Sequence, residues 1–199
     1  MKLFSTTILS MLAMLTSALA IEKPEYDMVK QSDGVELRRY KTLHIVTTSM
    51  EGNSGRNSSF RKLAGYIGKQ NEKEQKIAMT APVIMSPAEP TKTQSSAQAP
   101  MPKRMSFIVP QAVVDAGIPK PSNASVNLES IPGGLVVAVR YKGSYKQKSR
   151  DEAVAKLNAW IAKNNLRAIS EPSFAMYNPP WIPEFFRRNE VWIRVQNAQ

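Results

Sequence analysis

The sequence contains no cysteine and a single histidine, His44. Without cysteine the chain forms no disulfide, no thiolate metal site and no thioether link to a cofactor, and it has no thiol nucleophile. A Ser-His-Asp site would need His44 as its base, yet no Gly-x-Ser-x-Gly turn presents a serine. His-Glu-x-x-His and glycine-rich phosphate-binding patterns are also absent. We therefore expect a binding protein and not an enzyme, although the spacing of carboxylates leaves their chemistry open.

Long apolar runs are scarce, and the one at the N-terminus has the layout of a secretory signal. Lys2 precedes a mostly apolar run over residues 3–15, and small residues ending at Ala20 follow. The run is shorter than the ~20 residues of a bilayer-spanning helix, with an uncleaved anchor as the alternative. We expect residues 1–20 to be removed as a signal peptide near Ala20, and residues 21–199 to form a single soluble domain without a transmembrane segment. The protein is then exported, to a bacterial periplasm or by a eukaryotic secretory route.

The charge is strongly of one sign, with a net value of +11. A basic balance favours acidic partners such as nucleic acid, anionic lipid or carboxylated ligands. The lysines and arginines are scattered, however, and no aromatic-and-basic RNA-binding pattern occurs. Together with the signal peptide, this argues against nucleic acid as a partner. No pattern in the sequence specifies an oligomeric state.

The first half of the mature chain predicts the order strand, strand, helix, strand, strand. Residues 35–40 and 43–48 alternate apolar and polar side chains, which predicts two strands of an antiparallel pair. Apolar residues three and four positions apart predict an amphipathic helix over 58–70. Two further strands are predicted over 76–85 and 104–109, the first of them facing the interior of a barrel.

The second half repeats this order after a segment rich in Pro, Ser, Gln and Ala over 86–103, which predicts a flexible loop within the domain. Two strands separated by a Pro-Gly-Gly turn predict a hairpin. Ser149 and Glu152 predict a capping box at the start of a helix. The predicted elements are strands over 126–130 and 135–141, a helix over 150–164, and strands over 173–177 and 190–195.

Two such units, neither of which covers its own sheet, predict an α+β fold. We expect a distorted β-barrel or curved antiparallel sheet with two flanking helices, built as a pseudo-repeat of two strand-strand-helix-strand-strand units.

Four segments resemble the signature blocks of the SOUL haem-binding protein family. They are VELRRY at 35–40, KIAMTAPV at 76–83, MSFIVP at 105–110 and RRNEVW at 187–192. The blocks occur in the family's order and span nearly the whole mature chain. The resemblance implies a distorted β-barrel with two helices, in agreement with the order of elements above. It also implies reversible, non-covalent binding of haem or a related porphyrin, as a ligand and not as a catalytic cofactor.

The resemblance further implies that the ligand lies on an apolar surface formed by the first helix and a late loop. The loop over 177–186 carries three prolines and more apolar area than a loop usually exposes, which is typical of a ligand or partner surface. A lid folded onto the core is the alternative reading. Basic residues on the helix are placed to meet propionates by charge-assisted hydrogen bonds. The predicted ligand-binding residues are Phe60, Leu63, Ala64, Ile67, Tyr177, Trp181, Ile182 and Phe185, with Arg61 and Lys62 as propionate partners.

Axial ligands for a haem iron are few in this sequence. Some SOUL proteins have been assigned an axial histidine in the block that corresponds to 35–40, where this sequence has Arg39. His44 follows a few residues later and is a weak candidate metal ligand. Met79 and Met85 carry thioethers, which ligate iron in some haem proteins, but methionines in a strand are more typical of pliable core residues.

Three functions fit these patterns. The first is an exported haem carrier or buffer. The second is a binding module for another amphipathic small molecule, and the third is a protein-interaction or membrane-surface role that uses the 177–186 loop and the basic surface. Haem degradation on this fold would depend on the iron of the ligand. Arg187 and Arg188 fit either contact with propionates or an ion pair with Glu190 or another acid.

Overall fold

The computed structural model describes residues 21–50, 55–87, 103–143, 146–179 and 181–198. The predicted signal peptide and most of the predicted loop over 86–103 lie outside the described residues. None of the described helices combines the length and the apolar character that crossing a bilayer requires.

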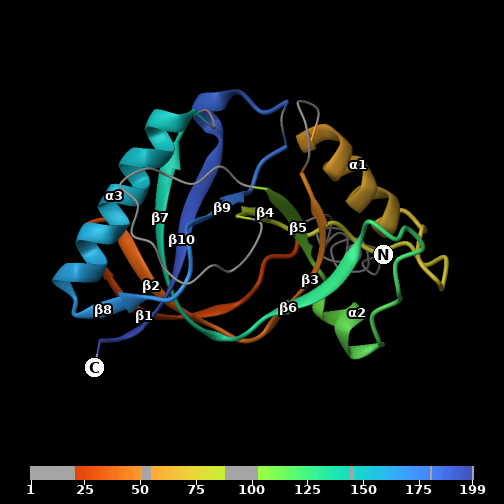
Figure 1. Cartoon of the computed structure of the whole chain (residues 1–199), viewed down its shortest axis with the longest axis horizontal. Helices are drawn as coiled ribbons and strands as arrows, with labels where there is room; N and C mark the ends of the chain where they lie inside the picture. The colour runs from red at the N-terminus through yellow and green to blue at the C-terminus, as the bar shows by residue number, and fades with distance from the viewer. Residues whose placement is uncertain (1–20, 51–54, 88–102, 144–145, 180, 199) are drawn as a thin grey trace, which may run out of the picture.

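The described strands form one ten-stranded sheet, in the order β1-β2-β7-β10-β9-β4-β5-β3-β6, with β8 paired to β10 beside this path. Figure 1 shows that the sheet curls into a half-barrel. The strands are β1 (Tyr26–Ser32), β2 (Val35–Tyr40), β3 (Leu43–Ser49), β4 (Val83–Ser86), β5 (Arg104–Ile108), β6 (Asn127–Ile131), β7 (Gly134–Lys142), β8 (Leu166–Ala168), β9 (Ser173–Met176) and β10 (Arg188–Asn197). The helices are α1 (Gly55–Ile67), α2 (Gln111–Asp115), α3 (Gln147–Lys163) and the 3-10 helix η1 (Glu184–Phe186).

The two long helices flank the curled sheet. α1 packs on β3 and β5, and α3 packs on β7, β8 and β10. In Figure 1 they lie on opposite sides of the half-barrel. This arrangement confirms the predicted α+β class, and the predicted strands and helices of each half occur in the predicted order among further elements. The sequence patterns did not predict β1, β8 or α2.

Side chains alternate between the two faces of the sheet along each strand, and both faces carry a cluster of buried apolar residues. The face toward the helices carries the main core, in which Leu63, Val137 and Leu157 have no exposed surface. The face inside the curl carries a second apolar cluster that includes Tyr40 and Trp192. Polar side chains on this inner face are therefore set beside buried aromatic rings.

The two predicted hairpins were wrong. Within the described sheet, β2 pairs with β1 and β7, whereas β3 pairs with β5 and β6. β2 and β3 act as one long bent strand, and so do β6 and β7. The two bent strands run antiparallel in one continuous register, from Val35 opposite Val139 to Thr47 opposite Asn127. Alternation predicted the strands but not their partners, because it is a local signal and pairing is not.

The Pro-Gly-Gly segment is the bend of a long strand and not a hairpin turn. A Cβ on Gly133 would lie 2.9 Å from the carbonyl oxygen of Tyr40, so the two bent strands approach closely where glycine has no side chain. A tight hairpin joins β1 to β2 through Asp33 and Gly34, whose φ angles of 54° and 71° are those of a primed turn.

The predicted strand over 76–85 is a strand only at its end, since β4 begins at Val83. Pro82 has no N–H to donate, so a ladder cannot continue through it. Upstream, the hydroxyl of Thr80 donates to the carbonyl of Ile108 at 2.6 Å. The apolar run is thus joined to the sheet by isolated hydrogen bonds and not by a ladder, and most of it is not a strand.

The predicted capping box of α3 was also wrong. The helix begins at Gln147, and its N-cap is Lys146, which makes no side-chain capping bond. The carbonyl of Lys146 already accepts a hydrogen bond from the backbone N–H of Arg150. Ser149 therefore lies inside the first turn, where it cannot act as the cap.

Candidate ligand-binding site

The loop between β9 and β10 presents three aromatic side chains to solvent. Trp181 is 79% exposed, Phe185 69% and Phe186 71%. The ring centroids of Phe185 and Phe186 lie 4.4 Å apart. With the half-buried Ile182, these residues form what we term the aromatic ledge. Such exposed, adjacent apolar side chains are typical of a binding surface, and they do not form the lid onto the core that was the alternative.

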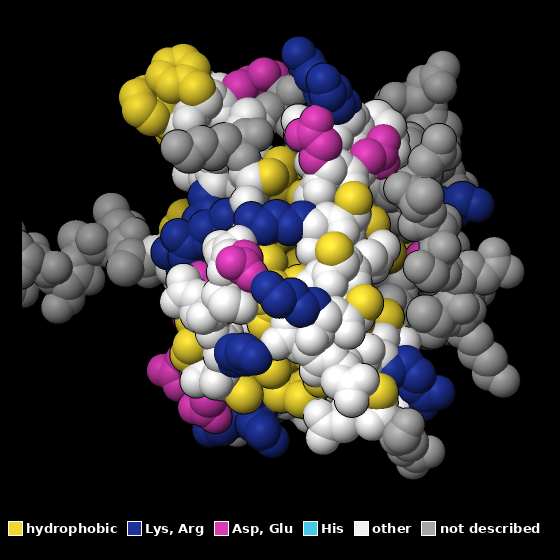
Figure 2. Space-filling view, turned by 90° about the vertical axis from the view of Figure 1, so that its left-hand side faces the viewer, with side chains coloured by type: hydrophobic (Ala, Val, Ile, Leu, Met, Phe, Trp, Pro, Cys, Tyr) yellow, Lys and Arg dark blue, Asp and Glu magenta, His cyan; other side chains and the backbone are white. Residues whose placement is uncertain are grey.

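The aromatic ledge is held by local hydrogen bonds. Arg187 donates from Nε to the carbonyl of Ile182 at 2.6 Å, and its backbone N–H donates to Glu184 at 3.1 Å. The 3-10 helix η1 packs beside β7, and β10 begins directly after it at Arg188. Figure 2, which views the α3 side, shows hydrophobic side chains projecting at the top and Lys and Arg side chains crossing the face below. The ledge is thus fixed next to the first residues of β10.

A cluster of arginines and glutamates lies on the inner face of the sheet. Its centre is Glu190, whose side chain is fully buried. Arg38, itself 1% exposed, donates from Nη1 and Nη2 to the two carboxylate oxygens of Glu190 at 2.7 and 3.1 Å. Arg38 also donates from Nε to Glu36 at 2.8 Å. This bidentate, charge-assisted pair fixes the middle of β2 to the first residues of β10 across β7.

Further donors converge on the same carboxylate. The indole of Trp192 and the hydroxyl of Tyr177 donate to Oε2 of Glu190 at 2.8 and 3.0 Å. Arg188 and Arg140 both contact Oε1, at 2.6 Å from Nη2 and 3.3 Å from Nε respectively. Of the two readings left open for Arg188, the ion pair with Glu190 is present. We term Glu36, Arg38, Arg140, Arg188 and Glu190 the arginine cluster.

The ionisation of this cluster follows from its contacts. Burial alone would raise the pKa of the Glu190 carboxyl, but the hydrogen bond and charge of Arg38, followed by bonds from Trp192 and Arg188, lower it from 4.5 to about 2. Burial would lower the pKa of the Arg38 guanidinium, yet Glu190 raises it. Burial and the Glu190 charge raise the pKa of Tyr177. The carboxylate therefore stays charged and the phenol stays a donor at neutral pH.

Acid is expected to remove the stability that Glu190 contributes. Because the folded-state pKa is lowered from 4.5 to about 2, the contribution is complete above pH 4.5 and is lost as the pH falls to about 2. The lowering corresponds to roughly 3 kcal/mol of unfolding free energy. Urea unfolding at a series of pH values measures it, and a free energy of unfolding that stays constant below pH 4.5 would contradict this assignment.

Tyr177 connects the arginine cluster to the aromatic ledge. Its ring is half-buried and lies 4.1 Å from the guanidinium carbon of Arg188. It follows β9 directly, at the start of the loop that carries the ledge. The sequence-predicted loop residues Tyr177, Trp181, Ile182 and Phe185 thus belong to one continuous surface segment, and their contact with a ligand stays a prediction.

The predicted residues of α1 divide between core and surface. Leu63 is fully buried, so its side chain serves the main core. Phe60 is 40% exposed and its ring packs on Phe107 with centroids 5.4 Å apart. Ala64, Ile67 and Lys62 are half-buried and Arg61 is exposed.

The start of α1 lies near the late loop. Arg56 in its first turn donates to the sulfur of Met176, the last residue of β9, at 3.5 Å. The ledge itself, however, packs toward β7 through η1. A binding role for the α1 residues stays a prediction.

The weak metal candidate His44 lies on β3, in the other half of the sheet. Its Nδ1 is 3.0 Å from the hydroxyl of Ser130. Among the described residues, no group of three or more His, Asp or Glu side chains could hold a metal ion. Met85 is 1% exposed and Met79 packs on the same main core, so both methionines are core residues. Iron ligation by His44 stays a prediction.

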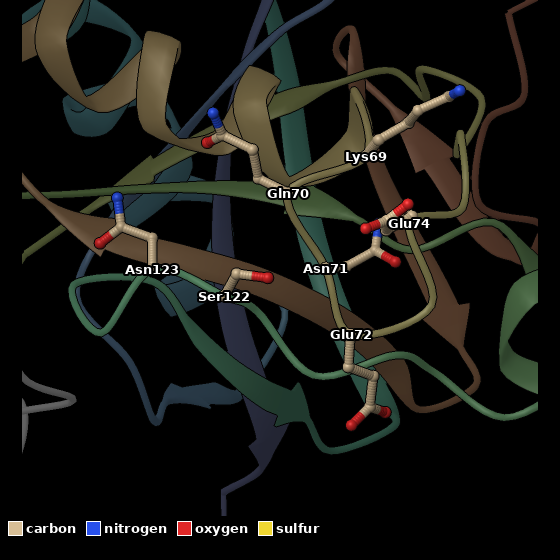
Figure 3. Close-up of a pocket in the computed structure, with 7 residues that line it drawn as sticks. All are labelled: Lys69, Gln70, Asn71, Glu72, Glu74, Ser122 and Asn123. Atoms are coloured by element: carbon tan, nitrogen blue, oxygen red, sulfur yellow. The ribbon is translucent and has the colours of Figure 1, made fainter.

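The structure also has two hollows, the second of which borders the arginine cluster through Tyr26, whose hydroxyl donates to Glu36 at 3.5 Å. The one in Figure 3 has a volume of about 450 Å³. Its only buried side chain, Asn71, uses its amide to bond the backbone of Tyr66 and Gln75. A second hollow of about 480 Å³ lies at residues 23–27, 39 and 41. Both have largely polar or charged linings, which suit a porphyrin plane poorly. The first is lined by Lys69, Gln70, Asn71, Glu72, Glu74, Ser122 and Asn123.

Sequence reasoning missed Arg38, Arg140 and Trp192 as partners of Glu190. One signal for Arg38 was available in the sequence. Arg38 lies two positions after Glu36, on the same face of a predicted strand, and an arginine that is buried there needs a carboxylate partner. The position of Arg140 directly opposite Glu190 depends on the register of β7 and β10, which no local pattern gives.

A known protein family matches nearly the whole length of the described fold. Residues 21–194 match the SOUL heme-binding protein family. The chain belongs to this family. Heme-binding protein 2 of Mus musculus is 31% identical over 188 residues, which cover 89% of this chain and 88% of that protein. Heme-binding protein 2 of Homo sapiens is 29% identical over 192 residues, which cover 91% and 89%. The resemblance seen in the four sequence blocks is confirmed.

The SOUL fold of this chain also occurs in solved structures. A chain of the EcmrR–DNA complex superposes with a TM-score of 0.59 at 14% sequence identity, and the match covers 82% of this chain and 57% of that chain. At this identity the likeness shows the fold alone.

Proposed function

We propose that this SOUL protein binds haem or a related tetrapyrrole reversibly and without a covalent bond, as an exported carrier or buffer. The observation that carries the proposal is the aromatic ledge, with three aromatic side chains each more than two-thirds exposed, next to the arginine cluster. A porphyrin is a flat apolar ring with carboxylate groups at one edge. The ledge offers stacking to the ring, and the adjacent arginines offer charge to that edge.

The residue types of the chain fit a ligand that is bound without a covalent link and then released. It contains no cysteine for a thioether link, and its one histidine lies in the other half of the sheet from the ledge. The ring and its carboxylates are then the recognised features, and the iron would supply the redox and ligand chemistry of haem. The signal-like N-terminus and the net charge of +11 support export and an anionic ligand.

A hemin titration tests this function. We expect the chain from Ile21 onward to shift the Soret band of hemin saturably. A Trp181→Ala, Phe185→Ala double variant should bind hemin roughly tenfold to a hundredfold more weakly, because it loses two stacking surfaces.

The matched control is a Met28→Ala, Val29→Ala double variant, which removes two exposed apolar side chains, 47% and 45% exposed, from the edge strand β1. Its hemin affinity should equal that of the parent. Equal weakening in both double variants, or no saturable shift in the parent, would refute haem binding on the ledge.

A binding module for another amphipathic small molecule is the second candidate. The ledge favours it because exposed aromatic rings recognise flat apolar ligands in general, and a fold does not determine its ligand. Displacement of hemin by unrelated amphipathic dyes with equal affinity would support this function over a dedicated tetrapyrrole carrier.

A further inference from the structure

We propose that Arg140 and Arg188 form a carboxylate-binding site at the rim of the inner face, which receives the propionates of a tetrapyrrole seated on the aromatic ledge. This inference rests on the proposed function and adds to it the residues that recognise the acidic edge of the ligand. The sequence expectation named Arg61 and Lys62 on α1 for that role and left propionate contact open for Arg188, whereas Arg140 is added here.

The arginine cluster carries more positive than negative charge. Three arginines, Arg38, Arg140 and Arg188, face two glutamates, Glu36 and Glu190. The two glutamates are already bonded to Arg38, which takes both oxygens of Glu190 and one of Glu36. The charge of Arg38 is therefore matched within the protein, and the excess lies on the other two arginines.

The excess charge is also the accessible part of the cluster. The side chain of Arg140 is 56% exposed and that of Arg188 is 30% exposed, whereas Arg38 and Glu190 are at 1% and 0%. Arg140 reaches Glu190 only through Nε, at 3.3 Å, and its guanidinium has no other polar partner among the described residues. Its outer N–H groups are thus available to a carboxylate, for which the planar guanidinium is well shaped.

The two arginines are placed together and next to the ledge. Both contact the same oxygen, Oε1 of Glu190, so their guanidinium groups lie side by side. Arg188 is stacked on Tyr177 and follows Phe186 of the ledge by two positions. The 3-10 helix of the ledge packs beside β7, the strand of Arg140. A flat ligand on the ledge therefore has both arginines at one edge.

The test compares hemin with its dimethyl ester, which has the same ring and iron but no propionate charge. We expect an Arg140→Gln variant to bind hemin about tenfold more weakly than the parent does, with its affinity for the dimethyl ester unchanged. Unfolding in urea confirms that the variant is folded. The control is an Arg39→Gln variant, which removes an exposed arginine at the end of β2 away from Arg140 and should bind hemin as the parent does. An Arg61→Gln, Lys62→Gln variant compares the two candidate propionate sites, and it should lose less hemin affinity than Arg140→Gln does.

Each outcome decides between the two proposals. If the parent binds hemin and Arg140→Gln binds it equally well, the carboxylate site is overturned while haem binding stands. The same holds if Arg140→Gln weakens hemin and the ester equally, or if the Arg39→Gln variant or the Arg61→Gln, Lys62→Gln variant loses as much hemin affinity. If the parent binds neither hemin nor the ester, the proposed function fails and the carboxylate site with it.

Discussion

Replacing Glu190 with glutamine is expected to lower the free energy of unfolding by about 3–5 kcal/mol. Glutamine keeps the shape of the side chain but removes the charge. Arg38 is 1% exposed, so its guanidinium would remain buried against a neutral amide, with only Glu36 as a charged partner. Removing one member of a buried pair leaves the desolvation cost of the other member without the attraction that offset it.

An exposed ion pair serves as the control, because it separates the cost of breaking a buried pair from the cost of removing a carboxylate in general. Arg104 and Glu129 form an ion pair in which the glutamate side chain is 42% exposed, and Glu129→Gln should cost less than about 1 kcal/mol. Urea unfolding at neutral pH measures both variants. Similar free energies of unfolding for the two would mean that the Glu190 carboxylate does not hold β2 to β10 as its contacts indicate.

Replacing Leu63 with alanine is expected to cost about 2–5 kcal/mol of stability and to leave hemin affinity unchanged. Leu63 has no exposed surface and belongs to the main core beneath α1, so its deletion leaves a cavity between the helix and the sheet. A ligand on the outside of the molecule does not reach this side chain in the folded protein.

Phe60 provides the comparison on the same helix. Although its side chain is larger, it is 40% exposed, so Phe60→Ala should cost less stability than Leu63→Ala does. Thermal or urea unfolding together with hemin titration of both variants tests the assignment. A Leu63→Ala variant that unfolds like the parent but binds hemin weakly would place Leu63 in the ligand surface, as the sequence pattern suggested, and not in the core.

The sequence by itself determined the classes and order of the elements. Helical spacing located α1 and α3, and alternation located β2, β3, β5, β6, β7, β9 and β10, because both periodicities are properties of neighbouring residues. It also identified the family and the exposed loop that became the aromatic ledge, since three prolines and several large apolar residues in a short segment exclude a regular strand.

Only the tertiary structure decided which strands pair and which charges meet. The bent strands β2–β3 and β6–β7 pair along one register across Gly133, where local patterns predicted two separate hairpins. That register, with the pairing of β7 and β10, sets Arg38, Arg140 and Glu190 together, although they are far apart in the chain. The same packing assigned Leu63 to the core. Contacts between distant segments depend on the relative positions of whole strands, and a periodic pattern within one strand does not carry that information.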